Sequence, residues 1–434
     1  MNILTIVVAV LTSLSIVITC ILKPSIRIKN ITINLYWVIA LVGALTLLFT
    51  TAISFKEVFN GLISNSSINP IKILILFLSM TMISIFLDEL GFFAKVANAV
   101  LKHTKDSQFK IFIAFYLLVA ILTMFTSNDI IILTFTPFII MFCKNAKISP
   151  VPYLVSEFCA ANTWSMMFII GNPTNIYLAE SFGVDFVSYF LKMAIPTLLA
   201  GIVEFTLLIL VFYRKLKKPI EHEFEELPPL NRFLTIFGLI VLGSCTIMLI
   251  ISSYISIPMY LIAAISLATL TVGVLTYSII KKSKPTELLH TYKRAPYELI
   301  PFVISMFVIV LTLTKYHVTQ EIAEFLGNKF VVFSYGFSSL FMANLLNNIP
   351  MSVLYSSIEA NLNPTSLTGA LYASIVGSNI GAFITPVGAL AGIMWMGILK
   401  RHEVKYTFLD FIKYGVLIGV PVSSIAIVTL ILFN

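Results

Sequence analysis

The sequence predicts an all-α polytopic membrane protein, and three observations support that prediction. Of the 434 residues, 59% are hydrophobic and only 11% are charged, less than half the content of about 25% in soluble domains. Apolar stretches of about twenty residues, each long enough to cross a hydrocarbon core of roughly 30 Å as a helix, recur along the chain. Polar residues interrupt several stretches in a matched order. We expect roughly ten to eleven transmembrane helices in two inverted repeats, each with a re-entrant hairpin and a discontinuous helix.

The first apolar stretch, residues 3–22, predicts an uncleaved membrane span. No basic residue precedes it, and Lys23, Arg27 and Lys29 follow it. A secretory signal peptide has the opposite order, with basic residues before the apolar stretch. We therefore expect this segment to remain in the membrane as the first helix.

Basic residues in the connecting loops predict the orientation of the chain. When the first terminus is placed outside, one face of the membrane carries 23 of the 28 Lys and Arg residues. They fall in segments 23–29, 95–110, 144–147, 214–232, 281–294 and 400–413. Because an excess of Lys and Arg marks the cytoplasmic face, we expect a multi-pass protein of the bacterial plasma (inner) membrane with both termini outside. The net charge of +8 then reflects orientation in a lipid bilayer and not a nucleic-acid partner.

Two segments fit this orientation only as re-entrant hairpins that enter and leave by the same side. Residues 109–144 and 331–360 are each too long for one crossing, too short for two, and broken in the middle by polar residues. The first is expected to open to the cytoplasm and the second to the outside. Opposite entry sides are typical of inverted repeats, here 1–213 and 232–434. Between them, 214–231 is the most polar stretch and predicts a solvated cytoplasmic linker.

Each predicted repeat contains a polar hairpin tip, followed further along the chain by a second interruption rich in Gly, Asn and Pro. Non-helical backbone at membrane depth is tolerated only where it lines a cavity or is buried in protein. These interruptions therefore predict the working site near the bilayer midplane. The candidate substrate-binding or coupling-ion-binding residues are Thr126, Ser127, Asn128, Asp129, Gly171, Asn172, Thr174, Asn175, Asn347, Asn348, Gly377, Ser378, Asn379 and Thr385.

The residue types in these interruptions suit ion and oxyanion binding. Gly lets a helix open and Pro removes a backbone donor, while Asn, Ser and Thr can coordinate a cation or hydrogen-bond an oxyanion. Half-helix N-termini offer unpaired N–H groups to an anion, and freed carbonyls suit a cation. The alternative is that Asn, Ser and Gly mediate close packing between membrane helices. The matched order of four clusters favours the binding site.

Acidic residues inside apolar spans are costly and are candidates for function. Asp129 lies at the predicted tip of the first hairpin, while Glu157 and Glu204 lie inside apolar spans. All three are candidate proton carriers, and paired structural charges are the alternative for Glu157 and Glu204. Asp88 and Glu89 are neighbours, so on a helix they point about 100° apart and cannot both face one cavity. A solvated position at the cytoplasmic end of a span is the alternative for this pair.

Several motifs together resemble the arsenite efflux permease family, the arsenical pump membrane proteins of the ion transporter superfamily. The resemblance extends from about residue 70 to the end. Its motifs are LDELGFF at 87–93, SND at 127–129 with Thr136 and Pro137, APY at 295–297, LNNIP at 346–350, and GSN at 377–379 followed by TPVG at 385–388 and Trp395. The resemblance implies a carrier driven by the proton-motive force that exports arsenite or antimonite, with its site formed by hairpin tips and interrupted helices.

The chain departs from this family's pattern at three positions. Asn162 and Asn379 stand where an acidic residue is usual, and Phe383 stands where a lysine is usual. The segment 171–175 is more similar to the dicarboxylate and other anion carriers of the same superfamily. A sodium- or proton-coupled carboxylate or organic-anion transporter and a sodium–proton antiporter therefore stay open as alternatives. Sodium or proton as the coupling ion, a homodimer, and a separate ATPase subunit also stay open.

Other classes of protein are less compatible with the sequence. An intramembrane metalloprotease needs His-Glu-x-x-His, whereas His402 and Glu403 are followed by Val-Lys-Tyr, and no phosphate-binding loop of a primary pump occurs. A channel gives no reason for inverted hairpins. Cys20, Cys143, Cys159 and Cys245 lie far apart in apolar stretches without a CxxC pair, so neither a disulfide framework nor a metal site is indicated. We expect no enzyme activity and no cofactor beyond the coupling ion.

Overall fold

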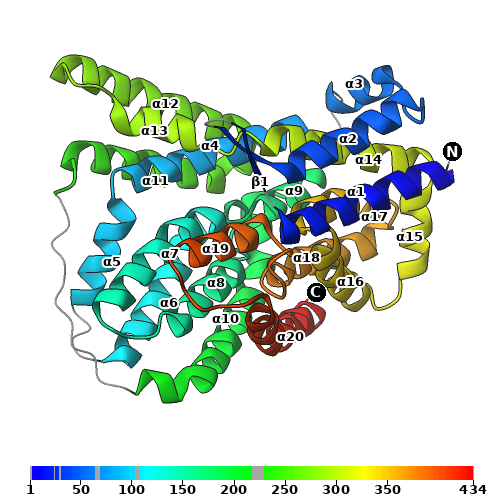
Figure 1. The fold of residues 1–434 in the computed structure, drawn as a ribbon. Coiled ribbons are helices and arrows are strands. Elements are labelled where there is room, and N and C mark those ends of the chain that lie inside the picture. Colours follow the sequence, from blue (N-terminus) through cyan, green and yellow to red (C-terminus); the bar gives the residue numbers. More distant parts are fainter. Residues whose placement is uncertain are drawn as a thin grey trace.

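The computed structural model describes residues 2–23, 25–28, 31–63, 69–102, 107–217, 229–255 and 257–433. Helices account for most of them (Figure 1). In chain order the elements are α1 (Asn2–Leu22), β1 (Ser25–Ile28), β2 (Ile31–Asn34), α2 (Leu35–Phe49), α3 (Phe55–Ile63), α4 (Pro70–Glu89), α5 (Phe92–Lys102), α6 (Gln108–Phe125), α7 (Asn128–Asn145), α8 (Val151–Trp164), the 3₁₀ turn η1 (Ile169–Gly171), α9 (Pro173–Ser181), α10 (Phe186–Leu216), α11 (Arg232–Ile255), α12 (Met259–Lys281), α13 (Thr286–Arg294), α14 (Leu299–Lys315), α15 (Val318–Leu326), α16 (Val331–Leu346), α17 (Asn348–Glu359), α18 (Pro364–Gly381), α19 (Leu390–Arg401) and α20 (Phe408–Phe433).

The outer surface of the molecule is apolar along its long helices. Within the described residues, nine helical segments are long and apolar enough to cross a membrane. Large aliphatic side chains stand exposed on several of them, such as Leu210 (68%), Val272 (63%) and Leu432 (73%). Water does not favour such a surface, whereas lipid tails do. The predicted helical polytopic membrane fold is therefore confirmed.

Two helix–turn–helix units occupy the predicted hairpin segments. In the first, α6 and α7 are joined by Thr126 and Ser127. In the second, α16 and α17 are joined by Asn347 alone, which adopts φ 79° and accepts a hydrogen bond from the backbone N–H of Ile349. An Asn tolerates such a positive φ better than most residues, so a single residue is enough to reverse the chain. The sides from which the hairpins open stay a prediction.

Each hairpin is followed by an interrupted helix, although the interruptions lie at other residues than predicted. The first separates α8 from α9 and spans residues 165–172, so the predicted break at 171–175 was placed too late; Thr174 and Asn175 lie in the first turn of α9. The second spans 382–389, between α18 and α19. Residues 377–381 therefore remain helical, contrary to the prediction.

Helix packing explains why the Gly-rich segment of α18 stays helical. A Cβ atom on Gly377 would lie 2.6 Å from the backbone N of Leu340 and 2.7 Å from the backbone O of Gly336, both on α16. A Cβ atom on Gly381 would lie 3.0 Å from the Ala343 Cβ. These glycines let α16 approach α18 closely, which is the packing role that small residues often have in membranes.

The order hairpin, interrupted helix, long helix occurs twice. The second occurrence packs on the first, because α17 and α18 contact α9, and α20 contacts α10. Helices α4, α11, α12 and α13 pack together on another side of the molecule (Figure 1). The repeat boundaries at 213 and 232 stay a prediction. Of the predicted linker 214–231, residues 218–228 lie outside the described residues, and α10 continues through its first three residues.

Three further elements differ from the sequence prediction. Predicted loops 95–110 and 281–294 contain parts of α5 and α13, two short amphipathic helices. The antiparallel hairpin of β1 and β2 is not part of an all-α fold. All four cysteines are buried and free, which agrees with their interpretation as small hydrophobic residues.

Ion pairs connect the ends of several helices. At the end of α4, Asp88 accepts a hydrogen bond of 2.8 Å from Arg294 on α13, and Glu89 contacts both Arg294 and His290. The acidic pair therefore binds a neighbouring helix, and its side chains are only 13% and 14% exposed. On α3, the hydrogen bond from Lys315 lowers the pKa of Glu57 to about 2.

Candidate transport site

A buried polar cluster joins the first interruption to the last turn of α18, and Asn379 on α18 lies at its centre. The Asn379 Oδ1 atom accepts hydrogen bonds from the Ser165 Oγ at 2.8 Å and from the Asn172 Nδ2 at 2.7 Å. The Asn379 Nδ2 donates to the Asn175 Oδ1 at 2.6 Å. All four side chains are buried. One amide of α18 therefore binds three residues of the first interrupted helix, more than 200 positions away in the sequence.

Two more contacts extend this cluster along the same interface. The hydroxyls of Thr174 and Ser378 lie 3.0 Å apart, each buried. The Asn175 Nδ2 also donates to the backbone carbonyl of Ser165 at 2.8 Å. Gly171 permits the tight turn beside it, because a Cβ atom there would lie 2.3 Å from that same carbonyl oxygen.

The tip of the first hairpin reaches the cluster through Asn162. The Asn128 Nδ2 donates to the Asn162 Oδ1 at 3.0 Å, and the Asn162 carbonyl accepts from the Ser165 Oγ at 2.7 Å. Asn128 and Asn162 are both fully buried. The Asn128 Oδ1 and the Ser127 Oγ have no hydrogen-bond partner among the described residues. Such buried polar atoms are rare in folded proteins, so they are candidates for binding a solute.

We name as the polar cluster the eight neutral side chains that these contacts connect. They are Asn128, Asn162, Ser165, Asn172, Thr174, Asn175, Ser378 and Asn379.

The tip of the second hairpin binds the second interruption instead of the polar cluster. The Asn348 backbone N–H donates to the Gly388 carbonyl at 2.9 Å, and the Asn347 Nδ2 donates to the Val387 carbonyl at 2.9 Å. In the same interruption the Thr385 Oγ1 is buried and has no partner among the described residues. Of the predicted site residues, Asn128, Asn175 and Asn379 thus belong to the polar cluster, while Asn348 contacts residue 388.

Two of the predicted acidic residues lie beside the polar cluster. Glu157 on α8 accepts hydrogen bonds from the Thr136 Oγ1 on α7, at 3.0 and 3.1 Å to its two oxygens. Glu204 on α10 accepts from the hydroxyl of Thr163, the residue after Asn162. Both carboxyls are buried, and the Glu204 Oε1 has no partner among the described residues. Glu157 precedes Asn162 by five residues on α8, and Glu204 reaches the polar cluster through Thr163, which directly follows Asn162.

Thr126 lies in the hairpin turn, as predicted, whereas Asp129 lies just after that turn. Asp129 stands in the first turn of α7 and not in the turn that joins the hairpin arms. Its side chain is half-buried, and no described residue connects it to the polar cluster by a hydrogen bond. A carboxylate in the first turn is favoured by the helix dipole. Thr126 is in the turn, where its hydroxyl donates to the Leu122 carbonyl at 2.8 Å.

Sequence reasoning missed Asn162, Ser165 and Glu359 as site residues. Asn162 and Ser165 hold the first interruption to the hairpin tip and to Asn379. A polar residue inside an apolar span was the available signal for Asn162. Glu359 is an acid inside the predicted second hairpin, so the rule that intramembrane acids are functional candidates applies to it as well.

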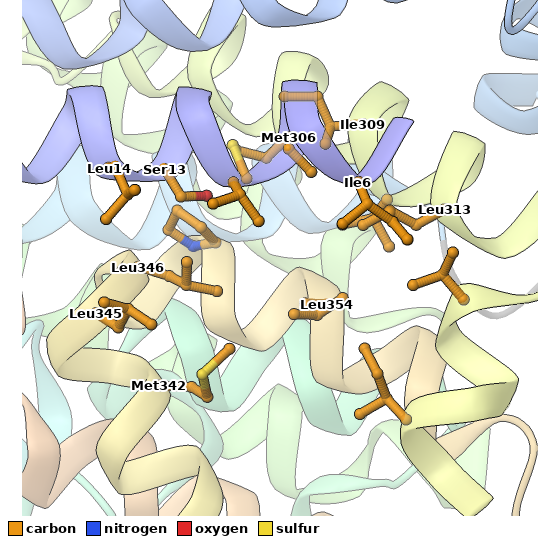
Figure 2. Close-up of a pocket in the computed structure, with 16 residues that line it drawn as sticks. Ile6, Ser13, Leu14, Met306, Ile309, Leu313, Met342, Leu345, Leu346 and Leu354 are labelled. Carbon is orange, nitrogen blue, oxygen red and sulfur yellow. The ribbon is translucent and has the colours of Figure 1, made fainter. Parts of the chain in front are cut away.

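An apolar cavity of about 200 Å³ lies beside the second hairpin and is distinct from the polar cluster. It is bounded by α1, α14, α15 and the hairpin (Figure 2). Aliphatic and thioether side chains such as Met306, Met342 and Leu346 line it, and Ser13 is its one polar side chain. Such a lining offers almost no hydrogen bonds to a polar solute. The polar cluster is therefore the better candidate for the transport site.

Comparison with known proteins places this geometry in a family. A family model described as citrate transporter matches residues 31–377, most of the chain. The chain belongs to the citrate transporter family. Its predicted resemblance to the arsenical pump membrane proteins is confirmed, at modest identity over most of the chain.

The relatives of this family member come from bacteria. A putative arsenical pump membrane protein of Bacillus subtilis is 27% identical, with 82% of this chain and 86% of the relative covered. An arsenical pump membrane protein of Escherichia coli is 24% identical, with coverage of 82% and 85%. The YdaH transporter of Alcanivorax borkumensis has the same fold, with a TM-score of 0.51, 13% identity and coverage of 98% and 97%. This member is accordingly a multi-pass membrane transporter.

Asn128→Ala is expected to reduce transport by this family member and to leave its membrane insertion intact. The substitution removes the hydrogen bond to Asn162 at the hairpin tip, which is worth about 1 kcal/mol, and leaves a buried acceptor unpaired at a cost of about 1–3 kcal/mol. The initial rate of solute uptake by reconstituted vesicles measures the effect. Asn361→Ala, at an exposed site after α17, is the control. A rate equal to that of the wild type would contradict the role of Asn128.

Proposed function

We propose that this protein is a proton-coupled secondary transporter of the bacterial inner membrane that exports arsenite or antimonite by alternating access. The observation that supports it is the polar cluster itself. Its amides and hydroxyls come from the first interruption and its flanking helices, from the end of α18 and from one hairpin tip, and they bind one another inside an apolar membrane fold.

The neutrality of the polar cluster favours a neutral, hydroxylated solute. None of its eight side chains carries a charge. Arsenous and antimonous acids are uncharged trihydroxides at neutral pH, and their hydroxyls donate and accept hydrogen bonds as amides do. Citrate carries several negative charges, and burying an anion without a paired cation is costly. The relatives named arsenical pump membrane proteins support the same solute.

The environment of the carbonyl groups favours protons over sodium as the coupling ion. Sodium coordination at an interrupted helix uses freed carbonyl oxygens. Here the carbonyls of Ser165, Val387 and Gly388 already accept hydrogen bonds from Asn175, Asn347 and the backbone of residue 348. Glu157 and Glu204 provide buried carboxyls beside the polar cluster that can bind and release a proton.

Orientation in the membrane completes the proposal. The excess of basic residues in one set of loops supports a cytoplasmic position for that set and an outside position for both termini. The first hairpin then opens to the cytoplasm and the second to the outside, so each gives one face access to the polar cluster in turn.

A carrier of carboxylates or other organic anions is the second candidate, and one observation favours it. The matching family model is described as citrate transporter. A site for citrate needs a cation nearby, and the polar cluster contains no charged side chain. The polar cluster therefore supports citrate transport less well than transport of arsenite or antimonite.

Transport by purified protein in vesicles tests the proposal and separates the two candidates. An imposed pH gradient should drive uptake of arsenite and antimonite, a sodium gradient alone should not, and citrate should neither move nor compete. Asn379→Ala vesicles measure the background. Uptake of citrate without uptake of arsenite or antimonite would contradict the proposal and support the second candidate. If neither gradient drives uptake of any of these solutes, both candidates are overturned.

A further inference from the structure

The two interrupted helices contain equivalent Asn residues. The Asn162 Nδ2 on α8 donates to the Phe158 carbonyl four residues earlier, at 2.8 Å, and the Asn379 Nδ2 on α18 donates to the Ile375 carbonyl four residues earlier, also at 2.8 Å. Both residues are fully buried in the last turns before an interruption. Five residues before Asn162 stands Glu157, and five residues before Asn379 stands Ser374.

At each of these two positions, the hairpin helix that packs against the interrupted helix supplies the other member of a carboxyl–hydroxyl pair. On the first interface, Glu157 of α8 is bonded to the hydroxyl of Thr136 on α7. On the second interface, the hydroxyl belongs to Ser374 of α18 and the carboxyl to Glu359 of α17. The same pair of groups thus occurs at both interfaces with the helices exchanged.

The environment of Glu359 makes it a place for a proton. Its side chain is fully buried, and its two carboxylate oxygens and the Ser374 Oγ form no hydrogen bond within standard geometric limits among the described residues. The titratable groups that face it are Tyr335 on α16 and Tyr355 on α17 itself. No charged group of the described parts of α9, α14, α15 or α18 compensates its charge. An ionised carboxylate without a partner is costly to bury, so Glu359 holds a proton when it is enclosed.

Glu359 lies at the end of α17 that is far from the hairpin tip and close to the surface. From Asn348 at the hairpin tip to Glu359, the helix is about 16 Å long at its usual rise per residue. The next residue, Ala360, is exposed. Glu157 stands only about 7 Å along α8 from Asn162 on the same reckoning. Figure 1 shows α7 and α17 toward opposite ends of the molecule.

We propose that Glu359 on the second hairpin is a further proton-binding site. It is the counterpart of Glu157, which lies beside the first hairpin. This inference rests on the proposed proton-coupled function. Movement of the second hairpin exposes Glu359 to outside water, where the carboxyl exchanges its proton. Closure of the hairpin returns it to its apolar surroundings only in the protonated, neutral form. The proton gradient thereby acts on the conformation of the hairpin.

Glu359→Gln tests this proposal, because glutamine keeps the shape and the neutral charge but cannot release a proton. The variant is expected to lose pH-gradient-driven uptake while exchange of antimonite across the membrane at equal concentrations persists. Glu324→Gln, at an exposed site on α15 beside α17, should behave as the wild type. Retention of gradient-driven uptake by Glu359→Gln would overturn the proposal.

A spectroscopic measurement decides the matter independently of transport. The infrared carbonyl band of protonated, buried carboxyls in purified wild-type protein should lose the component of Glu359 in Glu359→Gln, and that component should be altered in Ser374→Ala. An identical band in all three proteins would overturn the assignment, even if transport is proton-coupled. If the wild type transports none of the tested solutes, the proposed function fails, whereas the band still shows whether Glu359 carries a proton.

Discussion

Asn379→Ala is expected to abolish solute transport and leave the protein folded in the membrane. The substitution removes the side chain that joins α18 to Ser165, Asn172 and Asn175 of the first interrupted helix. Loss of three hydrogen bonds with buried partners costs about 3 kcal/mol or more, equivalent to a decrease of about 100-fold in a binding constant. No variant on the surface of the chain should have a comparable effect.

Initial uptake rates in vesicles measure this result, and two further variants sharpen it. Asn361→Ala makes the same chemical change at an exposed position and should leave the rate unchanged. Asn379→Asp keeps the acceptor for Ser165 and Asn172 but loses the donor to Asn175, so we expect partial activity. If Asn379→Ala transports at the wild-type rate, the site lies elsewhere. Size-exclusion profiles in detergent confirm that each variant is folded.

Gly377→Val is expected to destabilise the fold more than any other substitution considered. Even a Cβ atom at this position would lie 1.9 Å from the Ser339 Oγ. The hydroxyl can rotate away, but the backbone atoms of Leu340 and Gly336 at 2.6 and 2.7 Å cannot. Overpacking of this kind typically costs 1–3 kcal/mol, occasionally more, and the two further methyl groups of valine enlarge the clash.

The melting temperature of the purified protein in detergent measures the effect of Gly377→Val. Gly243→Ala on α11 is the matched control, because no atom lies within 4 Å of the added Cβ. It should melt at the wild-type temperature or slightly above it, since alanine favours helix more than glycine does. Equal melting of Gly377→Val and the wild type would show that α16 and α18 are not in tight contact.

The hairpins could be predicted because their sequence signals are local. Residues 109–144 and 331–360 each have two apolar arms around a polar centre. Each segment is also too long for a single crossing, so its length predicts a hairpin. The polar residues at the first hairpin tip and in the Gly- and Asn-rich segments that follow each hairpin also predicted much of the polar cluster, since Asn, Ser and Thr are uncommon in apolar spans. Asn128, Asn172, Asn175 and Asn379 were all identified in this way.

The positions of the interruptions could not be predicted, because they depend on contacts between distant segments. Gly377 and Gly381 read as helix breakers locally, yet they remain helical because α16 packs against them. Conversely, Ser165 lies in the part of the interruption that precedes the predicted break at 171–175, and its partner Asn379 is 214 positions away. Asp129 was predicted in the hairpin turn but lies in a helix, because α7 begins at Asn128, one residue before it.

The mutual bonding of the amides in the polar cluster sets a limit on affinity. A solute that enters among Asn172, Asn175 and Asn379 must first separate groups that already satisfy one another. Its gain is the difference between new and old hydrogen bonds, which is small. A carrier built in this way binds loosely and releases readily, and it discriminates against any molecule that replaces fewer bonds than it breaks. Such an interior suits rapid release of the solute, and not its tight binding at low concentration.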